Sequence, residues 1–559
     1  MKRFLIVFMV LGLLAGTVVT ADAKGTNPER VERTVEGSYG PPLTASDGSA
    51  LERLGVSVAM SGDTAIVGSL DTGLGPHQGA AYVFTHNGET WTEQAKLVAS
   101  DGAALDRFSY NAVAVSGDTA LVGAMWDDDG VDQDQGSAYV FTRSGTAWTQ
   151  QAKLIASDGA AQDNFGFSVA LSGDTAVIGA YWDDDGFTHQ GSAYVFTRSG
   201  TTWTQQKKLT APVGVTDQQF GYSVAVSDDT VLVGAVGDRV GANDDQGSAY
   251  VFTRTGNDWT QEAQLVAVGG AAGDGAGQAV GLSGDSAVVG ALNDDVGTNL
   301  DQGSAYIFAR TGTTWDQQAH LTASDGAAAD LFGRAAAISG DTALIGAEWD
   351  DTDGRENQGS AYIYRRSGAM WPQQEKLTAS DGALGDLFGT SVAISGDAGI
   401  IGASFDDVGF NPDQGSVYVF GQPTDPTDPT PTRVAIDVKP GDGTNRIRTS
   451  STESIAVAVL TTASFDATTI DPSSVCFGED PPAGGTTSYT QPTGVDADCN
   501  EGHRRGHIED ADGDGHLDMV LHFETDETGI DPGDEEARLT GRTTGGTSVE
   551  GSDSIRAVP

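Results

Sequence analysis

Two kinds of acidic segment in this chain carry side chains that could do chemistry. The first is a short run of Asp that recurs along the chain. Three of these runs begin with Trp, as Trp126-Asp127-Asp128, Trp182-Asp183-Asp184 and Trp349-Asp350-Asp351. Aromatic rings offer a stacking surface and carboxylates accept hydrogen bonds, so together they suit the binding of a glycan or a protein ligand. The alternative is that the rings pack between structural elements and the acids solvate the loops.

The second acidic segment lies near the C-terminus and has the spacing of a calcium loop. Its candidate ligands are Asp510, Asp512, Asp514, the carbonyl of His516, and Asp518. These residues stand at positions 1, 3, 5, 7 and 9 of such a loop, with a glycine at position 6 for the turn. Leu521 replaces the position-12 Glu of an EF-hand, so we predict a calcium loop between strands. An acidic turn without metal is the alternative.

The acids of the first kind recur at equivalent places, which argues against a catalytic site. Catalysis needs one nucleophile or one acid–base pair in an environment of its own. We therefore expect a protein that is not an enzyme. A secreted carbohydrate-active enzyme that uses two of these Asp residues as an acid–base pair is the alternative.

The elements that position these acids are set by a sevenfold repeat. The tripeptide Ser-Gly-Asp, or a near copy, recurs at intervals of 55 or 56 residues, with its Asp at 63, 118, 174, 229, 285, 341 and 397. Each repeat holds four strand candidates, which in the third copy are residues 166–171, 175–180, 192–197 and 203–211. Seven small sheets in sequence predict an all-β chain with a seven-bladed β-propeller.

The two ends of the array predict that the ring closes. The last repeat stops after its third strand at Phe420, and the first is preceded by an orphan copy of the missing strand at residues 43–48. We expect that segment to lie beside residues 417–420 and to leave no open edge. Strand connections alternate between the two faces of a propeller, so the Asp-rich loops and the Ser-Asp-Gly loops between blades share one face.

Pairs of dipeptides in the repeats carry a resemblance to a known family. They are Phe165-Gly166, Phe220-Gly221, Phe332-Gly333 and Phe388-Gly389, with Gly179-Ala180, Gly234-Ala235, Gly346-Ala347 and Gly402-Ala403. Residues 40–420 thus resemble the FG-GAP repeats of the integrin α-subunit β-propeller and its bacterial and archaeal secreted relatives. The resemblance implies calcium loops between the Phe-Gly and Gly-Ala strands. Here only a tight Ser-Gly-Asp turn stands there, too short to supply the oxygen ligands of calcium.

Composition and the N-terminus limit the location and the partners. The formal net charge is -49, from 79 acidic and 30 basic residues, which disfavours nucleic acid because phosphate binding needs a basic surface. Residues 1–23 read as a signal peptide, with Lys2 and Arg3, the apolar run Phe4–Leu14 and Ala21-Asp22-Ala23. No later segment is apolar enough to span a membrane. We expect a secreted protein, extracellular or at the cell surface.

The chain therefore divides into five parts: a signal peptide (1–23), an N-terminal lead (24–39), the propeller (40–420), a Pro/Thr/Asp linker (421–432) and a C-terminal β-rich, sandwich-like module (433–559) that holds the calcium-type loop. The only cysteines, Cys476 and Cys499, are expected to form a disulfide in an oxidising compartment. These features favour a monomeric, non-enzymatic binding or adhesion protein for an extracellular glycan or surface protein. A passive surface or matrix scaffold is a further alternative.

Overall fold

The computed structural model describes a continuous all-β body and part of the C-terminal region. Described are residues 42–421 except 71–77, 89, 129, 131, 353 and 397, the backbone of one earlier strand, and beyond 431 the strands and residue 467. The signal peptide and the linker predicted from the sequence lie outside the described residues. No described segment forms an α-helix, so none could span a membrane as a helix.

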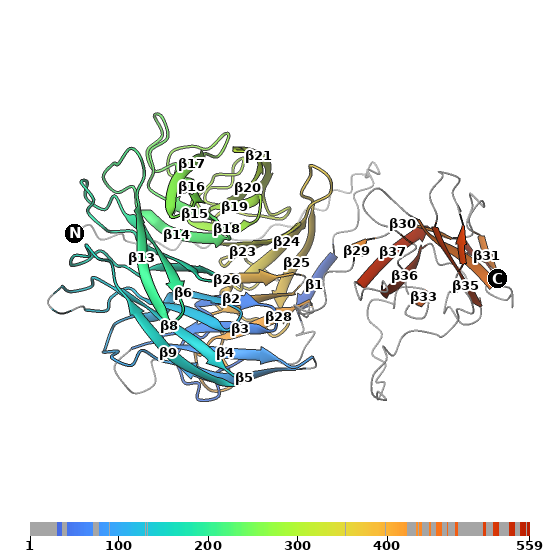
Figure 1. Ribbon diagram of the computed structural model, residues 1–559, viewed down its shortest axis with the longest axis horizontal. Helices are drawn as coiled ribbons and strands as arrows, with labels where there is room; N and C mark the ends of the chain where they lie inside the picture. The colour runs from blue at the N-terminus through green and yellow to red at the C-terminus, as the bar shows by residue number, and fades with distance from the viewer. Residues whose placement is uncertain are drawn as a thin grey trace, which may run out of the picture.

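Seven sheets lie around one axis, each an antiparallel meander (Figure 1). Blades 1 to 3 comprise β2 (Ser57–Ser61), β3 (Thr64–Ser69), β4 (Ala80–His86) and β5 (Trp91–Leu97); β6 (Phe108–Ser116), β7 (Thr119–Ala124), β8 (Ser137–Ser144) and β9 (Ala147–Leu154); and β10 (Ser168–Ser172), β11 (Thr175–Ala180), β12 (Ser192–Ser199) and β13 (Thr202–Leu209). The sevenfold β-propeller predicted from the repeat is confirmed.

The remaining blades have the same order of strands. Blades 4 to 7 comprise β14 (Phe220–Ser227), β15 (Thr230–Ala235), β16 (Ser248–Thr255) and β17 (Asp258–Leu265); β18 (Ala279–Ser283), β19 (Ser286–Ala291), β20 (Ser304–Thr311) and β21 (Thr314–Leu321); β22 (Ala335–Ser339), β23 (Thr342–Ala347), β24 (Ser360–Arg365) and β25 (Gln373–Ala379); and β26 (Phe388–Ser395), β27 (Ala398–Ala403) and β28 (Ser416–Phe420).

The core of the propeller lies between blades. Every residue of the second strand in each blade is buried, as the sequence Thr-Ala-Val-Ile-Gly-Ala of β11 illustrates. Between blades 2 and 3, Leu121 packs in one cluster with Phe165 and Ile178. A strand covered on both faces by neighbouring sheets must be apolar throughout, which explains why the repeat does not alternate there. The outer strands, with one wet face, do alternate.

Neighbouring blades approach so closely that two glycines must face each other. A Cβ on Gly179 would lie 2.0 Å from the carbonyl oxygen of Gly221 in the next blade, and one on Gly221 would lie 2.2 Å from that of Ser192. Gly221 also has a φ of +90°, which an L side chain rarely adopts. The two dipeptides of the repeat are thus two sides of a single contact between backbones.

The ring is closed at the junction predicted from the sequence. Leu43 donates its N–H to the carbonyl of Val417 (2.8 Å) and accepts the N–H of Val417 (3.0 Å). On the opposite face, the N–H of Gly62 in blade 1 donates to Ser395 Oγ in blade 7 (3.0 Å). Equivalent hydrogen bonds join the other six blade pairs, so blade 7 is linked to blade 1 as every other blade is to its neighbour.

An Asp–Arg–Trp clamp on this opposite face ties each of blades 2 to 6 to the blade before it. Asp174, of the Ser-Gly-Asp turn, accepts a hydrogen bond from Arg198 Nε (2.6 Å). Arg198 also donates to Thr119 of the preceding blade (2.9 Å) and stacks over the Trp203 ring. The in-register Trp and Arg residues are therefore structural.

Additional strands lie outside the seven blades. The strand β1 (Val31–Val35) extends blade 6 by pairing in parallel with β25, which nothing in the repeat pattern predicts. The C-terminal strands form one sheet of β29 (Thr432–Arg433), β37 (Ser548–Ser554), β36 (Glu536–Arg542) and β33 (Cys476–Gly478), a second of β30 (Ala435–Val438), β32 (Ser454–Leu460), β35 (Asp518–Glu524) and β34 (His507–Glu509), and a pair of β31 (Arg446–Arg448) and β38 (Arg556–Val558).

The glycine contact generates a stability prediction. A Gly179→Ala variant places a methyl group against the backbone of Gly221, which cannot move without displacing blade 4. We expect it to lower the free energy of unfolding by about 1–3 kcal/mol, as overpacking does, measured by chemical denaturation of the purified chain.

The matched control is Gly270→Ala, where the new Cβ meets only the flexible side chain of Gln246. That side chain can shift at the cost of its hydrogen bond to the Ala267 carbonyl, which is worth about 1 kcal/mol, so we expect a smaller loss than for Gly179→Ala. Equal losses in the two variants would contradict the proposed role of the glycine contact.

Candidate functional site

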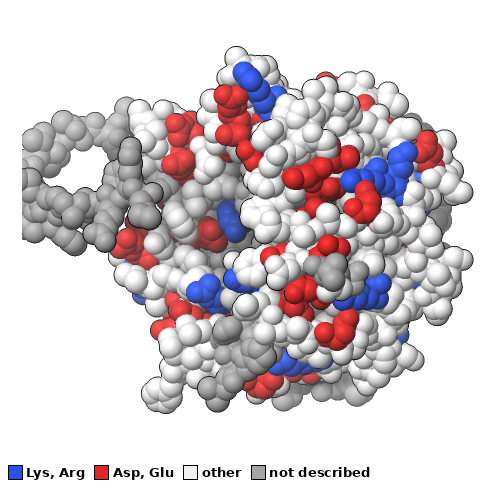
Figure 2. All heavy atoms as spheres, turned by 90° about the vertical axis from the view of Figure 1, so that its left-hand side faces the viewer, with Lys and Arg blue, Asp and Glu red and all other residues white. Residues whose placement is uncertain are grey.

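The Asp-rich loops and the loops between blades share one face of the propeller, called here the loop face. The two loop types touch directly, because Gln78 Nε2 donates to the Ala99 carbonyl (3.1 Å) and Gln246 Nε2 donates to the Ala267 carbonyl (3.3 Å). Figure 2 draws one side of the molecule, on which carboxylates and basic groups are interspersed. A large acidic excess therefore coexists with many local ion pairs.

The first Asp of the loop in blades 2 to 7 is buried or nearly so and is engaged by neighbouring side chains. Asp127 is only 5% exposed, and its Oδ2 accepts hydrogen bonds from Ser137 Oγ (2.5 Å) and Tyr139 OH (2.8 Å). Lys153 Nζ lies 2.7 Å from the same oxygen and also reaches Asp101 (2.9 Å). A buried carboxylate is stable only when it is paired and hydrogen-bonded in this way.

The same arrangement recurs around the ring. Asp183 pairs with Lys208 (2.7 Å), and Asp350 pairs with Lys376 (2.6 Å); Asp238, Asp294 and Asp406 each bond the equivalent Ser and Tyr of their own blades. Of the residues predicted to face a ligand, Asp127, Asp183 and Asp350 thus lie inside the blades. In the structure, these three carboxylates anchor the loop.

A second buried acid lies beside the cluster in every blade except blade 4, which has Gln218 at this position. Asp106 accepts the N–H of Ala103 (2.5 Å) and is 4% exposed. Burial raises the pKa of Asp106 to about 6; the bond from Ala103 opposes this rise, and the nearby charges of Asp127 and Asp128 add to it. The pKa of the equivalent Asp163, Asp330 and Asp386 is raised to about 6 as well.

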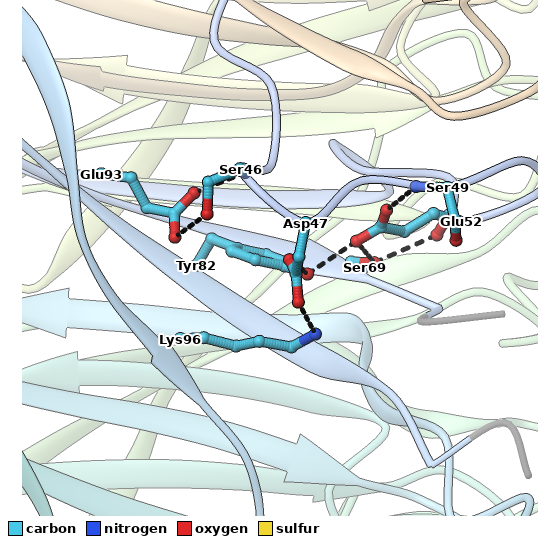
Figure 3. Close-up of polar contacts among 8 residues, drawn as sticks. All are labelled: Ser46, Asp47, Ser49, Glu52, Ser69, Tyr82, Glu93 and Lys96. Carbon is cyan, nitrogen blue, oxygen red and sulfur yellow. Dashed lines mark hydrogen bonds and ion pairs between the residues drawn. The ribbon is translucent and has the colours of Figure 1, made fainter. Parts of the chain in front are cut away.

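Blade 1 reaches the same result with a different acid (Figure 3). Glu52 stands where the other blades have Asp106 and its equivalents, and Thr72 stands where they have the buried Asp. The longer Glu52 side chain accepts from the N–H of Ser49 (2.8 Å) and also from Tyr82 OH (2.7 Å). Lys96 then pairs with Asp47 (2.9 Å). Because Glu is one methylene longer than Asp, the single carboxylate of Glu52 accepts both the backbone N–H that Asp106 binds in blade 2 and the Tyr hydroxyl that Asp127 binds there.

The cation of the cluster varies from blade to blade. Its repeat position holds Lys96, Lys153, Lys208 and Lys376 in four blades, Gln264 in blade 4 and His320 in blade 5, and Pro42 in the segment that completes blade 7. Gln264 donates to Asp238 (2.9 Å), and His320 stacks on the Tyr306 ring with its Nε2 3.3 Å from Asp294. In blade 7, burial and the charge of Asp381 raise the pKa of Asp406.

The second Asp of each loop is exposed. Asp128 accepts the backbone N–H of Asp134 (2.9 Å), Asp184 that of His189 (2.7 Å) and Asp351 that of Asn357 (2.8 Å). Each of these bonds spans five or six residues and fixes the loop. The remaining carboxylate oxygen of each residue is available to a ligand.

The three loop tryptophans differ in exposure. Trp182 and Trp349 are 37% and 44% exposed, and Trp182 stacks on His189 with ring centroids 5.2 Å apart. Trp126 is half-buried and carries Arg107 over its ring at 4.4 Å. Trp182 and Trp349 therefore have the free ring surface that a stacking platform requires, and Trp126 has less of it.

A cavity of about 300 Å³ opens at the blade 2 loops. Trp126, Asp106 and Asp128 line it together with the Asp127–Lys153 pair. This is the one place where the predicted residues Trp126, Asp127 and Asp128 meet in a concave site. The aromatic rings of the other two loops lie on separate blades.

The predictions for the C-terminal module fall largely outside the described residues. Asp510, Asp512, Asp514, His516 and Cys499 are not described, nor are the side chains of Asp518 and Cys476. The described backbone does pair Glu509 of β34 with Asp518 of β35 in an antiparallel register. Residues 510–517 therefore connect two paired strands, as the sequence predicts. No potential metal-binding group occurs in the part of the chain whose side chains are described.

Comparison with known proteins agrees with the repeat. A family model described as FG-GAP repeat matches residues 42–84, 91–141, 148–196, 203–252, 259–308, 315–364 and 371–420. Each match begins at the outer strand of one blade and ends at the third strand of the next. The first match therefore starts with the segment that completes blade 7. Sequence repeats and blades are thus offset by one strand, and this offset closes the ring.

Solved structures offer a weaker likeness. The chain is similar to Sqt1 from Chaetomium thermophilum, at 14% identity and a TM-score of 0.38 over 65% of this chain and 83% of that one. It is also similar to Sqt1 of Saccharomyces cerevisiae, at 8% identity and a TM-score of 0.35 over 67% and 100%. The search of curated proteins returned no match.

The raised pKa of Asp163 predicts a pH dependence. Its ordinary pKa is 3.8 and its folded value is about 6, so between these values the folded state binds more protons than the unfolded chain. Stability from this group therefore falls as pH rises through the window. An Asn at this position removes the charge, as Gln218 does in blade 4. We expect Asp163→Asn to gain stability relative to the parent from pH 4 to pH 7, measured by thermal unfolding.

Asp158→Asn is the control of opposite sign. Burial opposes ionisation of Asp158, but Lys208 lowers its pKa through a hydrogen bond and its charge. This variant should be less stable than the parent by a constant amount above about pH 4, where the ion pair is fully formed, and the difference should shrink as pH falls below 3.8 through the lowered pKa of Asp158. If the difference in unfolding temperature between Asp163→Asn and the parent does not change with pH, the pKa of Asp163 is not raised by burial.

Proposed function

The chain belongs to the FG-GAP repeat family, and from that membership we propose that it is a secreted, non-enzymatic binding or adhesion protein. It presents the loop face of its propeller to an extracellular glycan or surface protein. A propeller of this family is a binding scaffold, and FG-GAP repeats occur in extracellular proteins. The predicted signal peptide at residues 1–23 supports secretion.

The observation that carries this proposal is the distribution of exposed apolar side chains. Large apolar residues are exposed at Leu51, Val98, Leu105, Ile155, Trp182, Phe187, Val213, Val268, Leu300, Trp349, Leu384, Phe410 and Met370. Among the described residues, all of these except Met370 lie on loops of the loop face. Exposed apolar groups gathered on one face, beside exposed carboxylates, are typical of an interaction surface.

Repetition supports a function without catalysis. Asp106, beside Asp127 and with a pKa near 6, has the character of a general acid. Three further blades repeat that pKa and the same hydrogen bond to backbone. A property shared by four blades belongs to the scaffold, so the carbohydrate-active enzyme is the less favoured alternative.

Ligand binding is tested with a triple variant of the loop tryptophans. We expect Trp126→Ala, Trp182→Ala and Trp349→Ala together to reduce binding to glycan arrays and to cell surfaces at least tenfold. The physical reason is loss of stacking area at the loop face. The control is Met370→Ala, a more exposed apolar residue on the opposite face (69% exposed), which should leave binding within twofold. Unchanged binding of every detected ligand by the triple variant would rule out this surface.

Calcium binding at residues 510–518 is part of the proposal, with Asp510, Asp512, Asp514, the carbonyl of His516 and Asp518 as ligands. The pairing of Glu509 with Asp518 supports it, since it brings the two ends of the acidic segment together. We expect calorimetric titration of the full chain to detect a calcium site that Asp512→Asn with Asp514→Asn abolishes. Identical titrations of parent and variant would show that the segment is an acidic turn without metal.

A further inference from the structure

The repeat breaks its own symmetry at the start of each innermost strand. The residue after the Phe-Gly pair is Val56, Tyr110, Phe167, Tyr222, Gln278, Arg334 and Thr390 in blades 1 to 7. The residue after the Gly-Ala pair varies as freely, with Tyr181 in blade 3 and Glu348 in blade 6. The buried neighbours of these positions hardly change. Variation at otherwise equivalent places indicates that the scaffold does not require these side chains.

Five of these residues converge at the loop-face end of the propeller axis, and we call them the axial cluster: Tyr110, Tyr222, Gln278, Arg334 and Glu348. Arg334 Nε donates to Glu348 Oε1 (3.2 Å), and Gln278 Nε2 donates to Tyr222 OH (3.2 Å). Burial opposes the charge of Arg334, but Glu348 and, with it, the nearby Tyr222 and Tyr110 raise its pKa. Those two residues belong to blades 4 and 2, neither of which is next to blade 6, so the three side chains approach one another across the axis.

The axial cluster is accessible to solvent. The Arg334 side chain is 35% exposed, and that of its partner Glu348 is 10% exposed. Tyr110, Tyr222 and Gln278 are each half-buried. Arg334 uses Nε in its bond to Glu348, which leaves the two terminal nitrogens of its guanidinium to other partners.

Aromatic rings lead from the axial cluster outward along blade 3. Tyr222 contacts Phe167 at 4.9 Å between ring centroids, Phe167 contacts Tyr181 at 4.2 Å, and Tyr181 contacts Trp182 at 5.2 Å. Phe167 is only 8% exposed, so these rings pack behind the cluster, and Trp182 ends the series on the exposed loop. Blade 2 adds a shorter path, in which Arg107 lies between the rings of Tyr110 (4.7 Å) and Trp126 (4.4 Å).

This chemistry selects among ligand classes. The Arg334–Glu348 pair is neutral as a whole and offers donors beside acceptors, which sugar hydroxyl groups need on both sides. Aromatic rings bury the C–H faces of a sugar. An anionic ligand is disfavoured by Glu348 and by the net charge of -49, and a cation is disfavoured by Arg334 at the centre. A few convergent polar groups among aromatic rings are typical of a small-molecule site.

We propose that the axial cluster binds the terminal sugar of a neutral oligosaccharide. This inference rests on the proposed binding function and narrows its ligand to uncharged glycans. Arg334 and Glu348 hydrogen-bond the terminal hydroxyl groups. Tyr222 supplies a hydroxyl group and an aromatic face.

The test is binding of the full chain to cello-, manno- and chito-oligosaccharides, with oligogalacturonates as the acidic comparison. We expect Arg334→Gln to weaken binding of a neutral oligosaccharide at least tenfold and Tyr222→Phe to weaken it several-fold. The control Arg239→Gln changes an exposed arginine of the same face, 56% exposed and paired with Asp244, and should stay within twofold. Binding should change less than twofold between 50 mM and 500 mM salt, because the ligand carries no charge.

The outcomes separate this inference from the proposed function. If Arg334→Gln and Tyr222→Phe keep parental affinity while the triple tryptophan variant loses it, the axial cluster is not the site and the loop face still is. Tighter binding of oligogalacturonates than of neutral sugars overturns the neutral ligand class. If a surface protein binds and no oligosaccharide does, the inference fails and adhesion stands. Thermal unfolding of each variant shows whether lost binding reflects lost folding.

Discussion

The contact between the backbones of adjacent blades is the constraint from which the structure follows. A glycine ending the second strand of one blade faces the glycine that begins the next blade, at distances where a Cβ would overlap a carbonyl oxygen. Blade 2 has Ser109 in place of this glycine, with a φ of 68°. Its hydroxyl group hydrogen-bonds the N–H and the carbonyl of Ser69 and the carbonyl of Ala80. Seven such contacts set the spacing of the blades, and the tight spacing makes the second strands apolar on both sides.

Close packing also explains where the acids go. The loop face brings seven loops together near one another, and each loop needs an internal anchor. The chain uses a carboxylate that accepts from Ser and Tyr and pairs with Lys, and it varies the cation more freely than the acceptor. Part of the acidity is therefore structural. The exposed second Asp of each pair and the cavity at blade 2 remain for recognition.

The sequence predicted the architecture well because the repeat records it seven times. The blade number, the strand positions in the third repeat and the closing segment at Leu43 all follow from spacing. Sequence could not separate Asp127 from Asp128, since adjacent acids look alike. A signal was nonetheless present: Asp127 stands 10 and 12 residues before a Ser and a Tyr, a spacing that recurs in blades 4 to 7 and is one residue shorter in blade 3. The sequence shows a Glu at position 52, but not that its carboxylate reaches both the N–H of Ser49 and the hydroxyl of Tyr82. The strand β1 could not be predicted because it belongs to no repeat.

Residues that the repeated fold requires recur from blade to blade, whereas residues that serve a single binding site differ between blades. Residues that most blades need recur at equivalent positions because those blades share one geometry, as the Asp–Arg–Trp clamp and the buried Asp–Tyr pair show. A ligand site on the axis meets seven different side chains at one position, so each can be chosen independently. Arg334 is the single charged residue among the seven that follow the Phe-Gly pair, and its partner Glu348 is the single charged residue among those that follow Gly-Ala. A charged pair that the fold does not require, held half-buried among aromatic rings, is best explained by something that binds it.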